Sequence, residues 1–127
     1  MAVDKIPDEV RRFVVTSIPS IPYLEALLLL YESIIEEWNA ELLARRLYVT
    51  QRQAESLLES LQAAGFLTSN QRQKTFRYLP RDEFLQEAVI GLAAAYSSNL
   101  IEITHLIHSN TNKKSQQFAD AFKWRRD

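Results

Sequence analysis

Glu102, His105 and His108 are the residues whose types and spacing most resemble a metal site in this chain. Side chains three residues apart share one face of a helix, and the Glu-x-x-His arrangement supplies half of a di-iron carboxylate site. A complete site needs a second such motif and two more carboxylates facing it, and the sequence offers neither. We therefore predict no metal, interpret the histidines as ordinary residues near a helix end, and keep a metal-binding helical protein as the least favoured hypothesis.

Other catalytic arrangements are missing from the sequence. There are no cysteines, which excludes thiolate nucleophiles, thiolate metal sites and disulfides. Two isolated glycines cannot build a phosphate-binding loop, and no serine lies in a G-x-S-x-G turn. Glu36 and Glu37 are adjacent on a predicted helix and point to different faces, so they make a poor acid–base pair. The sequence predicts a protein that is not an enzyme and has no cofactor.

The charged residues are segregated along the chain, although the net charge is only −1. Residues 38–81 hold seven basic and three acidic side chains, whereas residues 1–37 hold three basic and seven acidic ones. Residues 82–109 hold four acids and no lysine or arginine, and residues 110–127 hold five basic and two acidic groups. A basic segment in a neutral chain is suited to a polyanionic partner, although solvated surface is the simpler explanation.

The length and composition are those of a globular protein. The chain has 127 residues, of which 46% are hydrophobic and 24% are charged. Its first residues, MAVDKIPDEVRRF, lack the apolar region of a signal peptide, and its longest apolar run, ALLLLY, is too short to cross a bilayer. We expect a soluble, cytoplasmic protein with one domain, an appended element and no membrane partner.

Apolar residues recur at helical spacing through most of the chain. Ser20, Asn39 and Thr50 precede such runs and are suited to accept hydrogen bonds from the free N–H groups of a first helical turn. Gly65 directly follows one run and can take the left-handed conformation that closes a helix. The run at residues 21–37 is apolar nearly all round, which indicates a central core helix. The expected helices span residues 8–18, 21–37, 39–48, 50–64 and 82–109.

The periodicity changes in the segment FLTSNQRQKTFRYLP. A polar centre is flanked by short segments rich in aromatic and β-branched residues. Alternation places Phe76 and Tyr78 on one face and Arg77 and Leu79 on the other. The segment therefore predicts a β-hairpin with its tip near residues 70–73.

The order helix, helix, turn, helix and hairpin across residues 21–80 resembles the winged helix-turn-helix. The stretch ELLARRLYVTQRQAESLLESLQAAGFL is similar to the family pattern, in which a helix carries Leu-Ala and a following Leu, and a second helix ends Leu-x-x-x-Gly-aromatic/Leu-Leu. The matching positions are Leu43, Ala44, Leu47, Leu61, Gly65, Phe66 and Leu67. The similarity is broadest to MarR/PadR-like bacterial transcriptional regulators, many of which form dimers through flanking helices.

The resemblance implies a fold class and a domain organisation. The fold is expected to be mainly α with a small β-hairpin, as a winged helix-turn-helix with flanking N- and C-terminal helices. Residues 1–81 would form that domain with its N-terminal helix, and residues 82–109 a long C-terminal helix used for dimerisation. Residues 110–127 would be a polar linker followed by a short basic and aromatic tail.

The resemblance also makes residues 50–64 the recognition helix and residues 68–79 the wing. The N-terminal residues of a recognition helix reach base edges, where Gln can pair with adenine, Arg with guanine and Ser with either. Cations of a wing can contact the backbone or the minor groove. The expected DNA-binding residues are Thr50, Gln51, Arg52, Gln53 and Ser56 on the helix, Arg45 and Arg46 before it, and Arg72, Lys74 and Arg77 in the wing. The simpler explanations are a solvated helix face and an edge hairpin kept soluble by its charge.

Glu55 and Glu59 depart from this expectation, because carboxylates near phosphate are repelled and lose water without compensation. Glu55 could hold Arg52, one turn away, or accept a hydrogen bond from cytosine N4. Glu59 could turn toward Arg45 or Arg46. Without such pairing, the two acids indicate a modest DNA binder.

Residues 82–109 carry an apolar stripe that is wide for so small a domain. We expect it to pack on residues 8–18 and 21–37 and on the same elements of a second copy, which would place two recognition helices on a two-fold axis. Gly91 suggests the close approach of another backbone, and Asn99 either fixes the register of a helical pairing or is simply solvated. The expected dimerisation residues are Leu85, Val89, Leu92, Tyr96, Leu100 and Ile103.

The C-terminal tail combines aromatic and basic residues. Phe118 and Phe122 are expected to cover an edge of the core, while the sequence leaves open whether Trp124, Arg125 and Arg126 contact a protein partner, DNA or the chain's own domain. The leading hypothesis is a homodimeric transcriptional regulator that binds double-stranded DNA. The alternative is a winged-helix adaptor that binds protein through the same recognition surface, or through the C-terminal helix and tail, without reading a DNA sequence.

Overall fold

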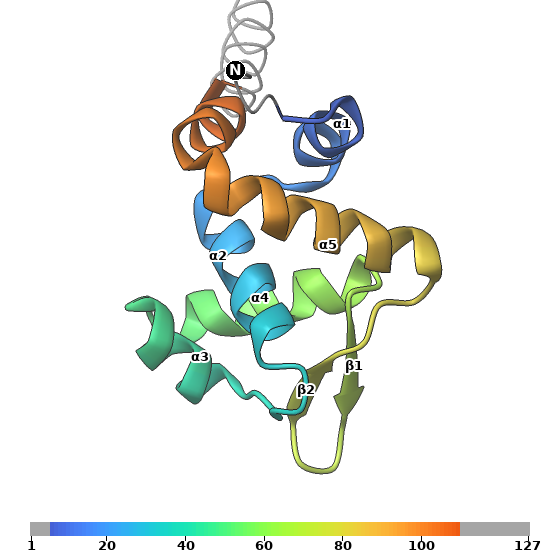
Figure 1. The fold of residues 1–127 in the computed structure, drawn as a ribbon. Helices are drawn as coiled ribbons and strands as arrows, with labels where there is room; N and C mark the ends of the chain where they lie inside the picture. The colour runs from blue at the N-terminus through green and yellow to red at the C-terminus, as the bar shows by residue number, and fades with distance from the viewer. Residues whose placement is uncertain (1–5, 110–127) are drawn as a thin grey trace, which may run out of the picture.

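Helices α1 and α5 lie along one side of the protein, α3, α4 and a two-stranded hairpin lie on the other, and α2 runs between them (Figure 1). The structure, a computed structural model, describes residues 6–109. In chain order its elements are α1 (Asp8–Ser17), α2 (Ile21–Glu32), α3 (Ala40–Leu47), α4 (Gln51–Ala63), β1 (Leu67–Asn70), β2 (Thr75–Tyr78) and α5 (Glu83–Ser98). The predicted fold class, mainly α with a small β-hairpin, is confirmed, and the topology is winged-helix-like.

Helix α2 is the central helix of the core. The Ser20 hydroxyl accepts a hydrogen bond from the backbone N–H of Tyr23 at 3.3 Å, which fixes the start of the helix. Most of the apolar side chains that follow are buried, and they cover most of the circumference of the helix. The expectation that this helix continues to residue 37 was wrong, because it ends at Glu32. The chain then turns and brings Trp38 to the edge of β2, where a longer helix could not place it.

Helices α3 and α4 both begin at the residues that the sequence predicted. The Asn39 side chain accepts a hydrogen bond from the Leu42 N–H at 2.8 Å. Thr50 and Gln53 form a complete capping box, in which each side chain accepts a hydrogen bond from the other residue's backbone N–H at 3.0 Å. The start of α4 is thus fixed by hydrogen bonds between residues that are close in the sequence, and the same is true of its end.

The far end of α4 closes on Gly65, whose φ of +94° lies in the left-handed region. The Gly65 N–H donates to the Gln62 carbonyl and the Phe66 N–H donates to the Leu61 carbonyl, both at 3.0 Å. This pair of bonds is the Schellman closure, and it turns the buried Phe66 back onto the core. The hairpin that follows therefore leaves α4 in a fixed direction.

The hairpin pairs β1 with β2 in antiparallel register, with Leu67 opposite Tyr78 and Asn70 opposite Thr75. Trp38 extends β2 on its other edge through two backbone hydrogen bonds of 2.7 Å with Phe76. The hairpin is therefore anchored on both sides: β1 follows α4, and β2 is tied to the segment that precedes α3.

The long C-terminal helix expected at residues 82–109 is broken at Asn99. Helix α5 ends at Ser98, and a second helix covers residues 100–109 of the described range. The Asn99 N–H and its side-chain amide both donate to the Ala95 carbonyl, while the Asn99 carbonyl accepts from Ile103 at 3.0 Å. Asn99 thus ends one helix and starts the next, and the chain bends after α5 (Figure 1). Ile103 and Ile107, beyond the bend, are buried in the core.

Most apolar side chains of the stripe on residues 82–109 are buried within the chain's own core. Leu85, Val89, Leu92 and Ile103 are buried in the core, Tyr96 is half-buried, and only Leu100 of the six expected dimerisation residues is exposed. The four buried residues are therefore not available to a second copy, contrary to the expectation. Gly91 does meet a close neighbour, but it is a side chain of α1: a Cβ atom there would lie 3.3 Å from Val10 Cγ2.

Two further expectations concern the C-terminal tail and the absence of a membrane-spanning helix. The expected roles of Phe118, Phe122, Trp124, Arg125 and Arg126 lie outside the described residues. Within residues 6–109, no single helix is both long and apolar enough to span a membrane. Helices α1 and α2 reach that length and composition only as a pair bent by 117°.

Two buried polar atoms behind the hairpin have no hydrogen-bond partner in the described part of the chain: Trp38 Nε1 and the Tyr78 hydroxyl. The Tyr78 ring packs edge-on against Tyr31, with ring centroids 5.6 Å apart. Burial, and secondarily Tyr31, raises the pKa of Tyr78 from 10.0 to about 12. Because the hydroxyl is buried without a hydrogen-bond partner, it lowers the stability of the fold at neutral pH. Because its pKa is raised by folding, the hydroxyl ionises at a lower pH in the unfolded chain than in the folded one.

We predict that Tyr78→Phe raises the free energy of unfolding by about 1 kcal/mol at neutral pH, because it removes a buried, unpaired hydroxyl. Since the folded pKa is the higher one, the stability linked to Tyr78 is fully present below pH 10 and is lost as the pH rises toward about 12. The variant should lose less stability over that range. Urea unfolding at neutral and alkaline pH measures both effects, and a less stable variant at neutral pH would contradict the assignment.

Candidate nucleic-acid interface

The leading turn of α4 is exposed to solvent. Ala54, Leu58 and Leu61 are fully buried and hold the helix on the core. Arg52 and Ser56 lie on the opposite side of the same helix and are exposed. The end of the helix that the resemblance assigns to base contacts is therefore outside the fold.

Thr50 and Gln53 are exposed but already engaged. The Gln53 side-chain oxygen accepts the Thr50 N–H, and the Thr50 hydroxyl accepts the Gln53 N–H. A two-point contact with adenine needs the oxygen as well as the nitrogen of a glutamine side chain. With the capping box closed, the Gln53 oxygen already accepts one hydrogen bond, so in this structure the two residues hold the start of α4.

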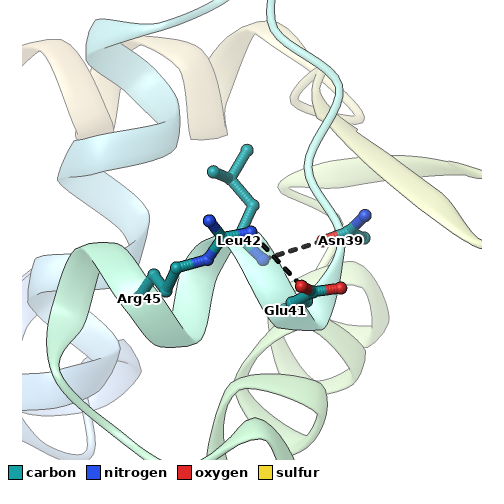
Figure 2. Close-up of polar contacts among 4 residues, drawn as sticks. All are labelled: Asn39, Glu41, Leu42 and Arg45. Atoms are coloured by element: carbon teal, nitrogen blue, oxygen red, sulfur yellow. Dashed lines mark hydrogen bonds and ion pairs between the residues drawn. The ribbon is translucent and has the colours of Figure 1, made fainter.

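Arg45 and Arg46 are held on α3. Figure 2 shows Arg45 beside Glu41, one turn earlier, and the Nη2 to Oε1 distance is 3.3 Å. Both side chains of this pair are largely exposed, so the pair is weak and Arg45 can leave it at little cost. The Arg46 guanidinium lies 5.6 Å from the centre of the Trp38 ring. The expected contact of Glu59 with either arginine is not formed.

A groove of about 570 Å³ separates α4 from the hairpin. It is lined by the start of α3, one side of α4 and the turn of the hairpin, namely Asn39, Ala40, Glu41, Gln51, Glu55, Leu58, Glu59, Gln62, Ser69, Asn70, Gln71, Gln73, Lys74, Thr75 and Phe76. Three of these residues are glutamates, and Lys74 is the only lysine or arginine among them. The inner wall of the groove is therefore acidic.

Neither Glu55 nor Glu59 has an ion-pair partner within the described range. The ion pairs there are Arg45 with Glu41 and Arg81 with Asp82. The expected Arg52–Glu55 pair is thus absent as well. Both carboxylates line the groove, and neither forms an ion pair with Lys74 or with another cation of the described residues.

The three cations of the hairpin point to different places. Arg77 lies opposite Thr68 and lines a smaller hollow of about 160 Å³ together with Glu37. Arg72 and Lys74 lie in the turn, where the Asn70 side chain accepts hydrogen bonds from the backbone N–H groups of Arg72 at 3.1 Å and Gln73 at 3.4 Å. Arg72 and Lys74 are thus at the exposed tip, while Arg77 lies further along β2 and shares its hollow with Glu37.

The charges of the described residues are sorted by the fold. The half formed by α3, α4 and the hairpin, residues 38–81, has a net charge of +4. Residues 6–37 carry two basic and six acidic groups and residues 82–109 carry four acidic groups, so the other part has a net charge of −8. Figure 1 shows that α1 and α5 lie on the side opposite the hairpin. The basic residues are therefore concentrated in the helix-turn-helix segment, although Glu37 of the acidic segment also lies at the hairpin, where its carboxylate accepts a hydrogen bond from the Thr75 hydroxyl at 3.2 Å.

No family model matches this chain, and neither does any curated protein or solved structure.

Glu41 is the groove residue that sequence reasoning did not include. Gln51, Glu55 and Gln62 could be assigned to one side of α4 from helical spacing alone. Glu41 belongs to a different helix, and no periodicity of α4 refers to it. Only the packing of α3 against α4 and the hairpin brings it to the same wall.

We predict that Gln53→Met, which keeps the length of the side chain but opens the capping box, lowers the free energy of unfolding by about 1 kcal/mol. Urea unfolding measures this loss. Gln51→Met is the matched control, because the Gln51 side chain takes no part in the box. Equal stability of the two variants would show that the box does not hold the leading end of α4.

Proposed function

We propose that this protein binds double-stranded DNA as a transcriptional regulator, with the leading turn of α4 in the major groove and the tip of the hairpin on the backbone. The observation that supports this most is the charge of residues 38–81, which form the helix-turn-helix and the hairpin: it is +4, whereas the rest of the described residues carry −8. A polyanion approaching such a molecule is steered to the positive end and repelled from the other. That end carries the exposed start of α4 and the hairpin tip.

The contacts of the proposed complex are few. Arg52 and Ser56 face outward from α4 and can reach base edges, and Arg72 and Lys74 can bind phosphates. Arg45 can be recruited from its exposed pair with Glu41. A small set of cationic contacts gives salt-sensitive binding, since each neutralised phosphate releases counterions.

The acidic groove sets the limit on affinity. A phosphate strand separates the major groove of DNA from the neighbouring minor groove. A duplex that receives α4 in one and the wing in the other lays this strand over the groove between them. Glu55 and Glu59 line that groove without partners. Repulsion between these carboxylates and the phosphates therefore weakens a complex that the overall field favours.

We predict that Glu55→Gln combined with Glu59→Gln strengthens binding to duplex DNA. Removal of each carboxylate should contribute about 1 kcal/mol, which is roughly fivefold in Kd. Fluorescence anisotropy with labelled duplexes at low salt measures the change. Glu87→Gln combined with Glu102→Gln, two exposed carboxylates of the acidic part, is the matched control and should change binding little. Failure of the wild-type protein to retain duplex DNA at low salt would refute the proposed function.

A second candidate function is favoured by the same groove. A cavity of about 570 Å³ that is walled by Glu41, Glu55 and Glu59 is suited to a basic segment of a protein partner. In that case the double glutamine variant should lose the partner, whereas in the DNA complex it should gain affinity. The opposite signs separate an adaptor from a DNA-binding regulator in one pair of measurements.

We further propose that the DNA-binding form is a homodimer that uses the surface at the break after α5. Leu100 is 51% and Ile101 is 81% exposed, and they are adjacent on the surface side of the second helix. Two copies joined there would present two recognition helices, as a two-fold symmetric site requires. The buried residues of α5 take no part in this contact.

We predict that Ile101→Asp converts a dimer into a monomer, because each copy would bring a charge into an apolar contact. Light scattering coupled to size exclusion measures the mass, and circular dichroism checks that the helices remain. Ile35→Asp is the control, since Ile35 is 88% exposed but lies between α2 and α3. A wild-type protein that is monomeric at tens of micromolar concentration would exclude the dimer.

A further inference from the structure

Tyr48 is the one tyrosine of the described residues whose side chain is not packed against the rest of the fold. Its side chain is 95% exposed, whereas Tyr23 and Tyr78 are buried and Tyr31 and Tyr96 are half-buried. Within residues 6–109 its ring pairs with no other aromatic ring and its hydroxyl forms no hydrogen bond. An aromatic side chain placed entirely in water contributes nothing to the stability of the core.

The backbone at Tyr48 is also one that a tyrosine does not favour. Tyr48 ends α3 with φ 58° and ψ 43°, in the left-handed region. Glycine closes a helix in this conformation without strain, whereas a residue with a Cβ atom does so at a cost. The turn itself is firmly held, because the backbone N–H groups of Tyr48 and Val49 both donate to the Ala44 carbonyl. The position of the Tyr48 backbone is thus fixed, although neither packing nor turn geometry requires a tyrosine there.

An exposed aromatic on a strained backbone points to a function outside the fold. Tyr48 lies in the turn between α3 and α4, two residues before the Thr50 cap and four before Arg52. In a helix-turn-helix complex the second helix enters the major groove and the first crosses the backbone, so the turn between them passes over a phosphate strand. A phenol hydroxyl at this place is a hydrogen-bond donor directed at phosphate oxygens.

We propose that the Tyr48 hydroxyl donates a hydrogen bond to a phosphate oxygen of duplex DNA, on the strand that borders the groove entered by α4. This inference rests on the proposed DNA binding and adds a contact that carries no charge. A neutral donor displaces no counterion, so it strengthens binding without adding to the salt dependence. It also acts on every sequence alike, because phosphates carry no sequence information.

The test compares four variants in duplex binding measured over a range of salt concentrations. Tyr48→Phe keeps the ring and removes the donor, and it should weaken binding to all duplexes about tenfold with an unchanged salt slope. Arg52→Gln should lower the magnitude of the slope by about one if Arg52 neutralises a phosphate, and should relax sequence preference if it reads a base. Tyr31→Phe, the same chemical change on α2, should bind like the wild type.

Tyr48→Gly provides the second measurement, because it separates the effect of Tyr48 on the stability of the fold from its effect on DNA binding. The glycine relieves the left-handed backbone, so Tm should rise while DNA binding falls as it does in Tyr48→Phe. A fall in Tm would show that Tyr48 stabilises the fold, which contradicts the premise.

The outcomes distinguish this inference from the function on which it rests. Wild-type affinity in Tyr48→Phe, with binding still weakened by Arg52→Gln, overturns the phosphate contact and leaves the DNA-binding proposal standing. A loss seen only in Tyr48→Gly assigns the contact to the ring and overturns the hydrogen bond. Absence of DNA binding by the wild-type protein refutes the proposed function and this contact together.

Discussion

The position of α4 on the core is the constraint on which the rest of the structure depends. Ala54, Leu58 and Leu61 bury one side of the helix completely, the capping box closes its start and the Schellman bonds at Gly65 close its end. Because the helix is fixed along its side and at both ends, it can neither rotate nor slide without breaking one of these contacts. The outward direction of Arg52, the inward direction of Glu55 toward the groove and the exit of the hairpin all follow from it.

Two electrostatic effects of different range compete at this helix. The net positive charge of residues 38–81 acts over distances comparable to the Debye length, about 8 Å at physiological salt, and in the proposed function it attracts a polyanion to the helix-turn-helix. The unpaired carboxylates of Glu55 and Glu59 act over a few ångströms and oppose a phosphate in the groove. Association would be governed by the first effect and the tightness of the final contact by the second.

The polar side chains around α4 are divided between holding the helix and facing the solvent. Thr50 and Gln53 have the chemistry of base contacts but are used by the capping box, and Arg46 lies against Trp38. Tyr48, in contrast, satisfies nothing inside the fold. Residue type alone would favour Gln53 over Tyr48 as a contact residue, whereas the hydrogen bonds engage Gln53 and leave Tyr48 free for the contact that we propose.

The break at Asn99 shows how the same apolar residues can support two architectures. A straight helix from residue 83 to residue 109 would have carried its stripe beyond the small core and required a second copy to cover it. With the bend, Ile103 and Ile107 fold back into the chain's own core, and a much smaller apolar surface at Leu100 and Ile101 is left outside. Any dimer must therefore be built on a different surface from the one that periodicity indicated.

The features that the sequence determined alone are those in which cause and effect lie within about one helical turn. Ser20, Asn39 and Thr50 cap their own helices, Gly65 closes α4, and alternation in residues 67–78 sets the faces of the hairpin. The order of the elements followed from these local signals taken one after another, and the uneven distribution of charge is a property of the sequence itself. The end of α2 at Glu32, the bend at Asn99 and the meeting of Glu41 with Glu55 across the groove were decided by the tertiary structure. Each depends on contacts between residues distant in the chain, such as the pairing of Trp38 with Phe76, and the free energy of such contacts outweighs the weak local preference to continue a helix.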